Sequence, residues 1–148
     1  MAEKYVEEIL SRDEDDGTMV ENVDTLRKSV VGRKIVSAGW APVTRVAKFY
    51  DRDRTYTEDS FVITLDDGTC VTLRNDGDCC AFTDLESFFL NVERIRHVIT
   101  GVGTTEGYTK WHIYAEMGDI LQLNVRWSCG NPFYYGYGFG IGVHQVTP

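Results

Sequence analysis

The chain lacks two kinds of segment that would place it at a membrane or outside the cell. No apolar run approaches the roughly 20 residues that cross a bilayer. Residues 1–8 contain neither the basic stretch nor the apolar core of a secretory signal. We therefore expect a cytosolic protein without membrane contacts. With 148 residues, of which 43% are hydrophobic, the chain is long and apolar enough for one domain with a real core.

Motifs of the common enzyme classes are also absent. No serine stands in a G-x-S-x-G nucleophile elbow. Residues 101–107 contain G-x-G but no lysine after it, so they match neither a Walker A loop nor a dinucleotide fingerprint. Of the three histidines, His97 is expected in a strand and His112 is expected to face water. These absences favour a protein that is not an enzyme and needs no cofactor.

Cysteine is present but without the spacing of a metal site. Cys70, Cys79, Cys80 and Cys129 lack the paired C-x-x-C pattern of structural zinc sites. Cys79 and Cys80 are adjacent, which is poor geometry for a disulfide between them, and a cytosolic chain with a sizeable core does not need disulfides. We expect reduced thiols and no metal, and the pattern leaves open only a zinc site formed by long-range convergence.

Basic residues are fewer than acidic residues, 15 against 23, and the excess negative charge is concentrated at one end of the chain. Residues 1–24 hold nine acidic and two basic side chains and so carry −7 of the net charge of −8. A nucleic-acid-binding protein usually shows a basic footprint, which is missing here. We expect residues 1–24 to form an acidic leader, with a short helix over 2–10 or partial disorder, before a single β-rich globular domain over 25–148.

Two hairpins are the clearest local signals. Residues 61–65 alternate apolar and polar side chains, the Asp-Gly pair at 67–68 supplies a turn, and 71–73 repeat the alternation. A second hairpin spans 111–127, with a turn near Met117 and with Arg126 on its polar side. The sequence further predicts strands over 33–38 and 95–99, a capped helix from Thr83, an exposed connection or strand end over 45–57 and a flexible loop over 101–107. The fold class is mainly β (α+β), a small antiparallel β-sandwich or open barrel with one or two short helices.

A glycine repeat near the C-terminus is the most unusual feature. Every second residue from Gly136 to Gly142 is glycine, with bulky and mostly aromatic residues between them. In a strand, this pattern leaves one face as bare backbone. Large residues of a neighbouring strand are the favoured cover, with Trp111 and Trp127 as candidates. The alternative is a groove for a ligand or partner, and Tyr134 on the glycine side is the aromatic residue most expected to be exposed.

Several stretches resemble a known family. They are HVITGVGTT at 97–105, GYTKWHIY at 107–114, WSCGNPFYYGYGF at 127–139, VGRKI at 31–35 and DCC at 78–80. Together they resemble an uncharacterised family of small accessory proteins from mycobacteriophages and related actinobacteriophages. The family is a domain of unknown function, so the resemblance implies no active site. It implies a phage accessory protein, which often binds and redirects a host component or blunts a host defence.

The expected function is non-enzymatic binding of a host protein or a small signalling ligand in the host cytoplasm during infection. We expect no nucleic-acid partner, and self-association is left open. The candidate binding residues comprise aromatic walls, charged groups and hydroxyl donors: Trp111, Tyr134, Tyr137, Lys110, Arg126, Thr104 and Thr105. A pocket and a flat protein interface would use the same residues. Two alternatives remain, a minor virion or assembly protein and a small hydrolase that uses Cys129 with His112 and Asp78.

Overall fold

The fold is mainly β, with two antiparallel sheets and one helix in the residues that the structure describes. This structure is a computed structural model that describes residues 5–11, 14–50, 52–77, 81–130 and 137–145. The elements, in chain order, are α1 (Thr18–Val30), β1 (Ile35–Phe49), β2 (Arg52–Leu65), β3 (Thr69–Arg74), β4 (Asp76–Gly77), β5 (Phe82–Leu90), β6 (Gly101–Thr105), β7 (Lys110–Ala115), β8 (Gly118–Ser128) and β9 (Gly140–Gln145).

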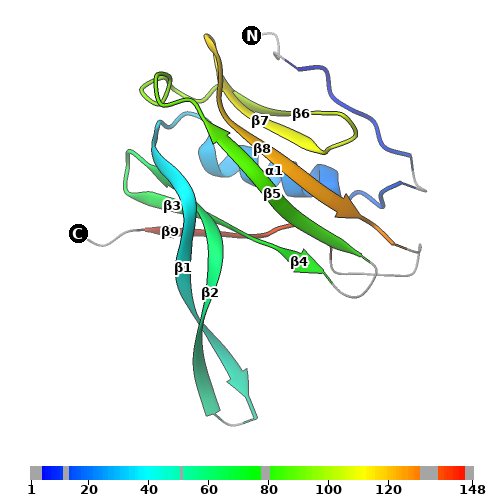
Figure 1. Ribbon diagram of the computed structural model, residues 1–148, viewed down its shortest axis with the longest axis vertical. Coiled ribbons are helices and arrows are strands. Elements are labelled where there is room, and N and C mark those ends of the chain that lie inside the picture. Colours follow the sequence, from blue (N-terminus) through cyan, green and yellow to red (C-terminus); the bar gives the residue numbers. More distant parts are fainter. Residues whose placement is uncertain (1–4, 12–13, 51, 78–80, 131–136, 146–148) are drawn as a thin grey trace.

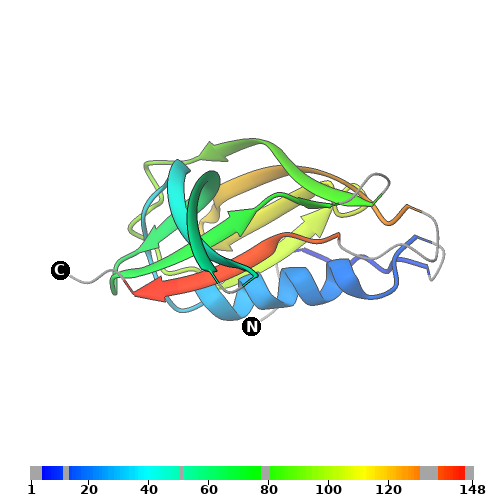
Figure 2. The same cartoon turned by 90° about the horizontal axis from the view of Figure 1, so that it is seen from below.

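The two sheets form a sandwich with an open side that the helix covers. One sheet has the order β1-β2-β3-β9 and the other the order β4-β5-β8-β7-β6. Helix α1 contacts both β9 and β6, the edge strands of the two sheets, and runs along the sandwich beside β9 (Figures 1 and 2). The mainly-β fold class is confirmed, and within the described residues the sheets do not close into a barrel.

The core is made by alternate residues of the strands, as the hairpin patterns predict. Phe61 and Ile63 of β2 are fully buried, and so are Trp111 and Ile113 of β7. Side chains of a strand alternate between its faces, so these residues share the inward face while the residues between them point outward. Both predicted hairpins are confirmed, β2 with β3 and β7 with β8.

Helix α1 belongs to the core although most of it lies in the acidic leader. Its buried residues are Met19, Val23, Leu26 and Val30, whose spacing places them on one face of a helix. The carboxylate of Asp15, two residues before the N-cap Gly17, accepts a hydrogen bond from the backbone N–H of Met19 at 3.2 Å and so satisfies a donor of the first turn. The helix therefore crosses the boundary that we expected at residue 24, and the end of the leader is part of the globular core.

Four local predictions differ from the structure. Residues 5–10 form no helix, and 95–99 contain a turn and a bend at 95–97 but no strand. The capping pattern at Thr83 lies in β5, and the loop expected over 101–107 is largely β6. In both of these cases pairing with a neighbouring strand decides the conformation, since β5 pairs with β8 and β6 pairs with β7. Local helix and loop signals are weak compared with such long-range pairing.

Among the described residues of the glycine repeat, strand β9 begins at Gly140. Tyr134 and Gly136 lie outside the described residues. The bare backbone of Gly140 is covered by the side chain of Arg74, whose Nη2 would lie 2.9 Å from an added Cβ. Trp111 and Trp127, the residues expected as cover, pack instead against the aromatic rings of Phe139 and Tyr137, respectively.

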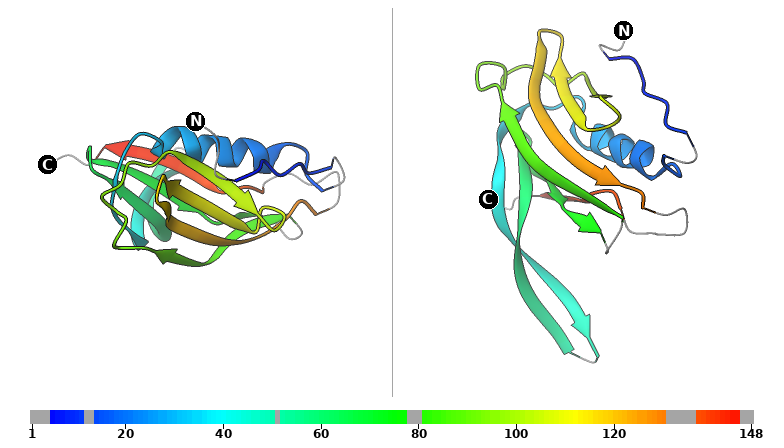
Figure 3. Two further views of the ribbon diagram at one scale, coloured as in Figure 1. Left: turned by 90° about the horizontal axis from the view of Figure 1, so that it is seen from above. Right: turned by 45° about the vertical axis from the view of Figure 1, so that its right-hand side comes forward.

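Strands β1 and β2 extend far beyond the body of the protein. Their register continues from Pro42↔Asp59 to Phe49↔Arg52, and we call residues 42–59 the arm. Figures 1 and 3 show the arm projecting away from both sheets, with no other described element beside its far end. The charged segment 45–57 is thus the paired end of two long strands. A hairpin of this kind gains little stability from its own two strands.

The packing of α1 leads to a first prediction. Leu26 is fully buried against the sheets, so the substitution Leu26→Ala removes apolar contacts and leaves a cavity in the core. We expect it to lower the free energy of unfolding by about 2–5 kcal/mol in urea denaturation. Lys28→Ala on the exposed side of the same helix should change it by less than about 0.5 kcal/mol. Equal effects of the two substitutions would contradict the role of α1 in the core.

Candidate functional site

The N-terminal segment 5–10, which we call the strap, lies on the outer face of the β6–β7 hairpin. Figure 3 shows it running beside β6 and β7, and its side chains make specific contacts with residues about 100 positions away in the sequence. The contacts come from Tyr5 at one end and Glu8 nearer the other. Nothing in the local sequence of the strap predicts this position, which depends on the tertiary fold.

A chain of hydrogen bonds centred on His112 lies beneath the strap. The ring Nδ1 of His112 is 2.8 Å from an oxygen of Asp119, and its Nε2 is 2.8 Å from the hydroxyl oxygen of Thr105. When Nδ1 donates its proton to the carboxylate, Nε2 accepts one from the hydroxyl. His112 is buried rather than facing water as expected, because the strap covers it. Both ring nitrogens are thus engaged within the protein.

Tyr5 of the strap closes this cluster. Its ring stacks on the imidazole of His112 with the centroids 4.2 Å apart, and its hydroxyl donates to the second oxygen of Asp119 at 2.6 Å. Gly103 makes room for the ring, because an added Cβ would lie 2.7 Å from the Cβ of Tyr5. Burial, together with the hydrogen bond to Asp119, raises the pKa of the Tyr5 phenol above its ordinary value.

The turn between β6 and β7 binds the carboxylate of Glu8. Its residues Glu106, Gly107 and Tyr108 all have positive φ, at 56°, 68° and 62°. This conformation points the backbone N–H groups of Gly107 and Tyr108 at the carboxylate, to which they donate at 2.7 and 3.0 Å. Successive N–H groups that converge in this way form an anion-binding nest. The hydroxyl of Tyr108 also donates to the backbone carbonyl of Glu8, at 3.3 Å.

A small cavity of about 110 Å³ separates the strap from α1 and β6. Thr104 lines it together with Arg27 of α1, whose Nη2 donates to the carbonyl of Val102 at 2.8 Å. Sites for drug-sized ligands usually have volumes of roughly 300–1,000 Å³. The cavity is therefore too small for a signalling ligand of a few hundred daltons.

The predicted binding residues separate into two groups. Thr104, Thr105, Lys110 and Trp111 lie together on the β6–β7 hairpin, where Thr104 pairs with Trp111 and Thr105 with Lys110. Trp111 is fully buried and donates from Nε1 to the carbonyl of Tyr108 at 2.9 Å, so it is not an accessible stacking wall. Lys110 lies 3.7 Å from the carboxylate of Glu106.

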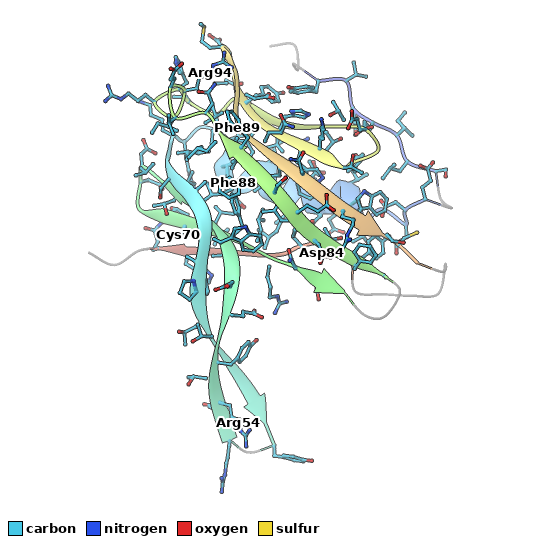
Figure 4. All side chains as sticks on the ribbon, viewed as in Figure 1. Arg54, Cys70, Asp84, Phe88, Phe89 and Arg94 are labelled. Carbon is cyan, nitrogen blue, oxygen red and sulfur yellow. The ribbon has the colours of Figure 1, made fainter. Side chains whose placement is uncertain are left out.

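The remaining candidates lie elsewhere. Arg126 of β8 forms an ion pair with Asp84 at 3.2 Å, in a hollow of about 450 Å³ that is open to solvent, and Figure 4 shows Asp84 on β5. Tyr137 is buried, and its hydroxyl donates to Asp15 at 2.7 Å and lies 2.5 Å from Asp16, so it also is no exposed wall. Tyr134 lies outside the described residues.

The cysteine-based hydrolase does not assemble in the part of the chain that the structure describes. The Sγ of Cys129 is 3.7 Å from the carbonyl oxygen of Gly130, while His112 is engaged by Thr105 and Asp119. Asp78, Cys79 and Cys80 lie outside the described residues. Cys70 carries a free thiol, and the described residues contain no group of three or more His, Cys, Asp or Glu that could hold a metal.

Fold and site together define a small mainly-β protein whose N-terminal strap occupies a polar site on one hairpin. Residues 28–141 match the family DUF7448, a domain of unknown function, and the chain belongs to this family. Membership of an uncharacterised family is thereby confirmed. No curated protein and no solved structure matches the chain. The matched residues include β6, β7 and Asp119, whereas the strap lies before them.

The contacts of Tyr137 generate a prediction about acid stability. Hydrogen bonds from Thr18 and Tyr137 lower the pKa of Asp16 below its ordinary value. A carboxyl whose pKa is lower in the folded state stabilises the fold above its ordinary pKa, and this stabilisation is lost as the pH falls through the lowered value. We expect Asp16→Asn to lower the urea midpoint at pH 7, and we expect the difference from the wild type to shrink as the pH falls below the ordinary pKa of an aspartate carboxyl.

Asp53→Asn on the exposed arm is the matched control and should leave the pH dependence of the urea midpoint unchanged. A constant difference between the wild type and Asp16→Asn at all pH values would contradict the assignment. It would show that the substitution disturbs packing rather than a charge-assisted hydrogen bond.

Proposed function

We propose that the protein is a non-enzymatic binding protein that contacts a partner protein through the β1–β2 arm. The observation that carries this proposal is the arm itself, two paired strands that leave the body and whose described side chains are not among those of the hydrophobic core. A segment that the core does not need is available for another surface. A β-hairpin also offers two rows of side chains on a semi-rigid backbone to a partner.

The exposed side chains of the arm and its base support this use. The solvent-exposed fractions are 91% for Tyr50 at the tip, 41% for Tyr56 on β2 and 42% for Trp40 at the base. Aromatic residues and arginine are enriched in protein interfaces because they bury large areas with few rotatable bonds. Arg52, Arg54 and Tyr56 occupy every second position of β2 and therefore share one of its faces. Figure 4 shows Arg54 near the far end of the arm.

The shape of the described surface suits a protein partner better than a small ligand. The cavity beside the strap is too small, and in the hollow beside Arg126 the guanidinium is already paired with Asp84. The arm presents a projecting surface rather than a concave one. Small-molecule sites are concave and bury most of the ligand, whereas protein interfaces are broad.

The setting that we propose is the cytoplasm of a phage-infected cell, where the protein would bind and redirect a host protein or blunt a host defence. The motifs at 97–114 and 127–139, which resemble small actinobacteriophage proteins, support this setting. The described part of the chain contains no helix that is long and apolar enough to cross a membrane.

Native mass spectrometry of tagged protein recovered from infected host cells tests the proposal. We expect the wild type to carry a host polypeptide and the double variant Tyr50→Asn/Tyr56→Ser to lose at least nine tenths of it, because the central aromatic residues dominate an interface. Asparagine at position 50 tolerates the positive φ of 58° found there.

Phe89→Ser is the matched control, since Phe89 is an exposed aromatic residue (66%) of β5, outside the arm (Figure 4). The control should retain the host polypeptide. Equal recovery with the arm variant would show that the contact lies elsewhere. Extra mass of a few hundred daltons, a bare monomer or a homo-oligomer in place of a host polypeptide would contradict the proposed function.

A further inference from the structure

We propose that the outer face of the β6–β7 hairpin is a binding site for a peptide segment with a tyrosine three residues before a glutamate, supplied by a partner protein. In this structure the strap occupies the site in cis, through Tyr5 and Glu8. The site is separate from the arm, and its test does not depend on the function proposed for the arm.

One half of the site recognises the tyrosine. His112 offers a flat ring for stacking. The rings of Tyr114 and Tyr5 pack edge to face with their centroids 5.4 Å apart, and Gly103 leaves space for the Tyr5 ring. Asp119 accepts the phenol hydroxyl at 2.6 Å. A phenylalanine would fill the same space but leave this oxygen without the hydroxyl, and such a site discriminates strongly against an analogue that lacks the hydrogen-bonding group.

The other half recognises a carboxylate. The N–H groups of Gly107 and Tyr108 hold both oxygens of Glu8, at 2.7 and 3.0 Å. These donors exist because the turn keeps positive φ at three successive residues, two of which are not glycine. Non-glycine residues rarely adopt this conformation. The N–H dipoles of a nest point their positive ends at the bound group, so the nest favours a carboxylate over a neutral amide.

The strap is bound in the manner of a ligand. Its residues 5–10 form no strand with β6, although β6 is an edge strand. Val6 and Ile9 have 89% and 92% of their surfaces exposed, and Leu10 is the aliphatic residue of the strap that packs, partly buried, against the core. The contacts of Tyr5 and Glu8 are the specific polar attachment of the strap, and a second segment with the same two side chains can replace them.

The division of the chain supports the same inference. The residues that form the site lie within 28–141, the part that matches the family, whereas the occupant comes from the preceding segment. Tethering gives the strap an effective concentration on the order of millimolar, so it acts as a built-in competitor. A partner segment must displace the strap, so the strap determines how tightly a partner segment has to bind in order to occupy the site.

The test uses the full-length chain with the strap released by Tyr5→Ala/Glu8→Ala. The probe is a fluorescein-labelled peptide of residues 1–11, and its anisotropy is measured during titration with protein. We expect saturable binding to the released variant and at least tenfold weaker binding to the wild type, whose own strap competes. Peptides with Tyr5→Phe or Glu8→Gln should each bind at least fivefold more weakly than the unmodified peptide.

Two glycine substitutions in the released variant provide a matched pair of controls. Gly103→Ala places a Cβ where the tyrosine ring must lie and should abolish binding. Gly39→Ala, with no atom within 4 Å of the added Cβ, should leave the affinity unchanged. Thermal unfolding shows that each variant is folded. If the double variant does not fold, Glu8→Gln, which keeps the contacts of Tyr5, takes its place with the same outcomes.

Two results would overturn the proposal. A folded, released variant that does not bind the peptide, or binds the substituted peptides equally well, shows that the face has no specificity for this segment. A wild-type dimer in native mass spectrometry that Tyr5→Ala/Glu8→Ala dissociates shows that the occupant is the strap of a second copy rather than a segment of a partner protein.

Discussion

The burial of α1 along the open side of the sandwich is the constraint on which the rest of the structure depends. Two sheets that pack face to face leave apolar side chains uncovered between their edge strands β6 and β9. Met19 and Leu26 fill this opening and are fully buried. Helix α1 contacts β6, and the strap that precedes it in the sequence lies beside the β6–β7 hairpin (Figure 3).

Acidic residues of the N-terminal region serve this arrangement as hydrogen-bond acceptors. Asp15 accepts a hydrogen bond from the backbone N–H of Met19 in the first turn of α1. Asp15 and Asp16 both accept hydrogen bonds from the hydroxyl of Tyr137, which is more than 120 positions away in the sequence. Glu8 receives two backbone N–H groups of a turn. Charged acceptors form stronger hydrogen bonds than neutral ones. The negative charge of this region thus has a structural use, besides any effect on solubility or on association with a partner.

The arm and the strap give the molecule two surfaces of different character. The arm is an extension of two core strands and carries exposed aromatic and arginine side chains. The strap is a separate segment, and hydrogen bonds of Tyr5 and Glu8 attach it to the outer face of the β6–β7 hairpin. A partner bound at the arm meets a surface that is always available, whereas a peptide bound at the β6–β7 face must compete with a tethered segment.

Local sequence patterns account for the elements that form between neighbours in the chain. The alternation in 61–65 and 71–73 with the Asp-Gly turn predicted one hairpin, and the alternation in 111–127 predicted the other, because side-chain period and turn chemistry act over a few residues. The same reasoning identified the mainly-β class. It placed Thr104 and Thr105 in one connection over 101–107, although most of that connection is strand β6.

Only the tertiary structure decided the rest. The local sequence predicts a helix start at Thr83, but the pairing of β5 with β8 places this residue in a strand. The local sequence predicts that His112 faces water, but Tyr5, which is 107 positions away, covers it. Tyr5, Glu8 and Asp119 carry no local signal of a site, since each gains its role from a partner distant in sequence. The sequence by itself determined which segments alternate apolar and polar side chains and where the turns between them lie. The packing of sheets and helix decided which polar groups meet, because such contacts depend on the closure of the whole core.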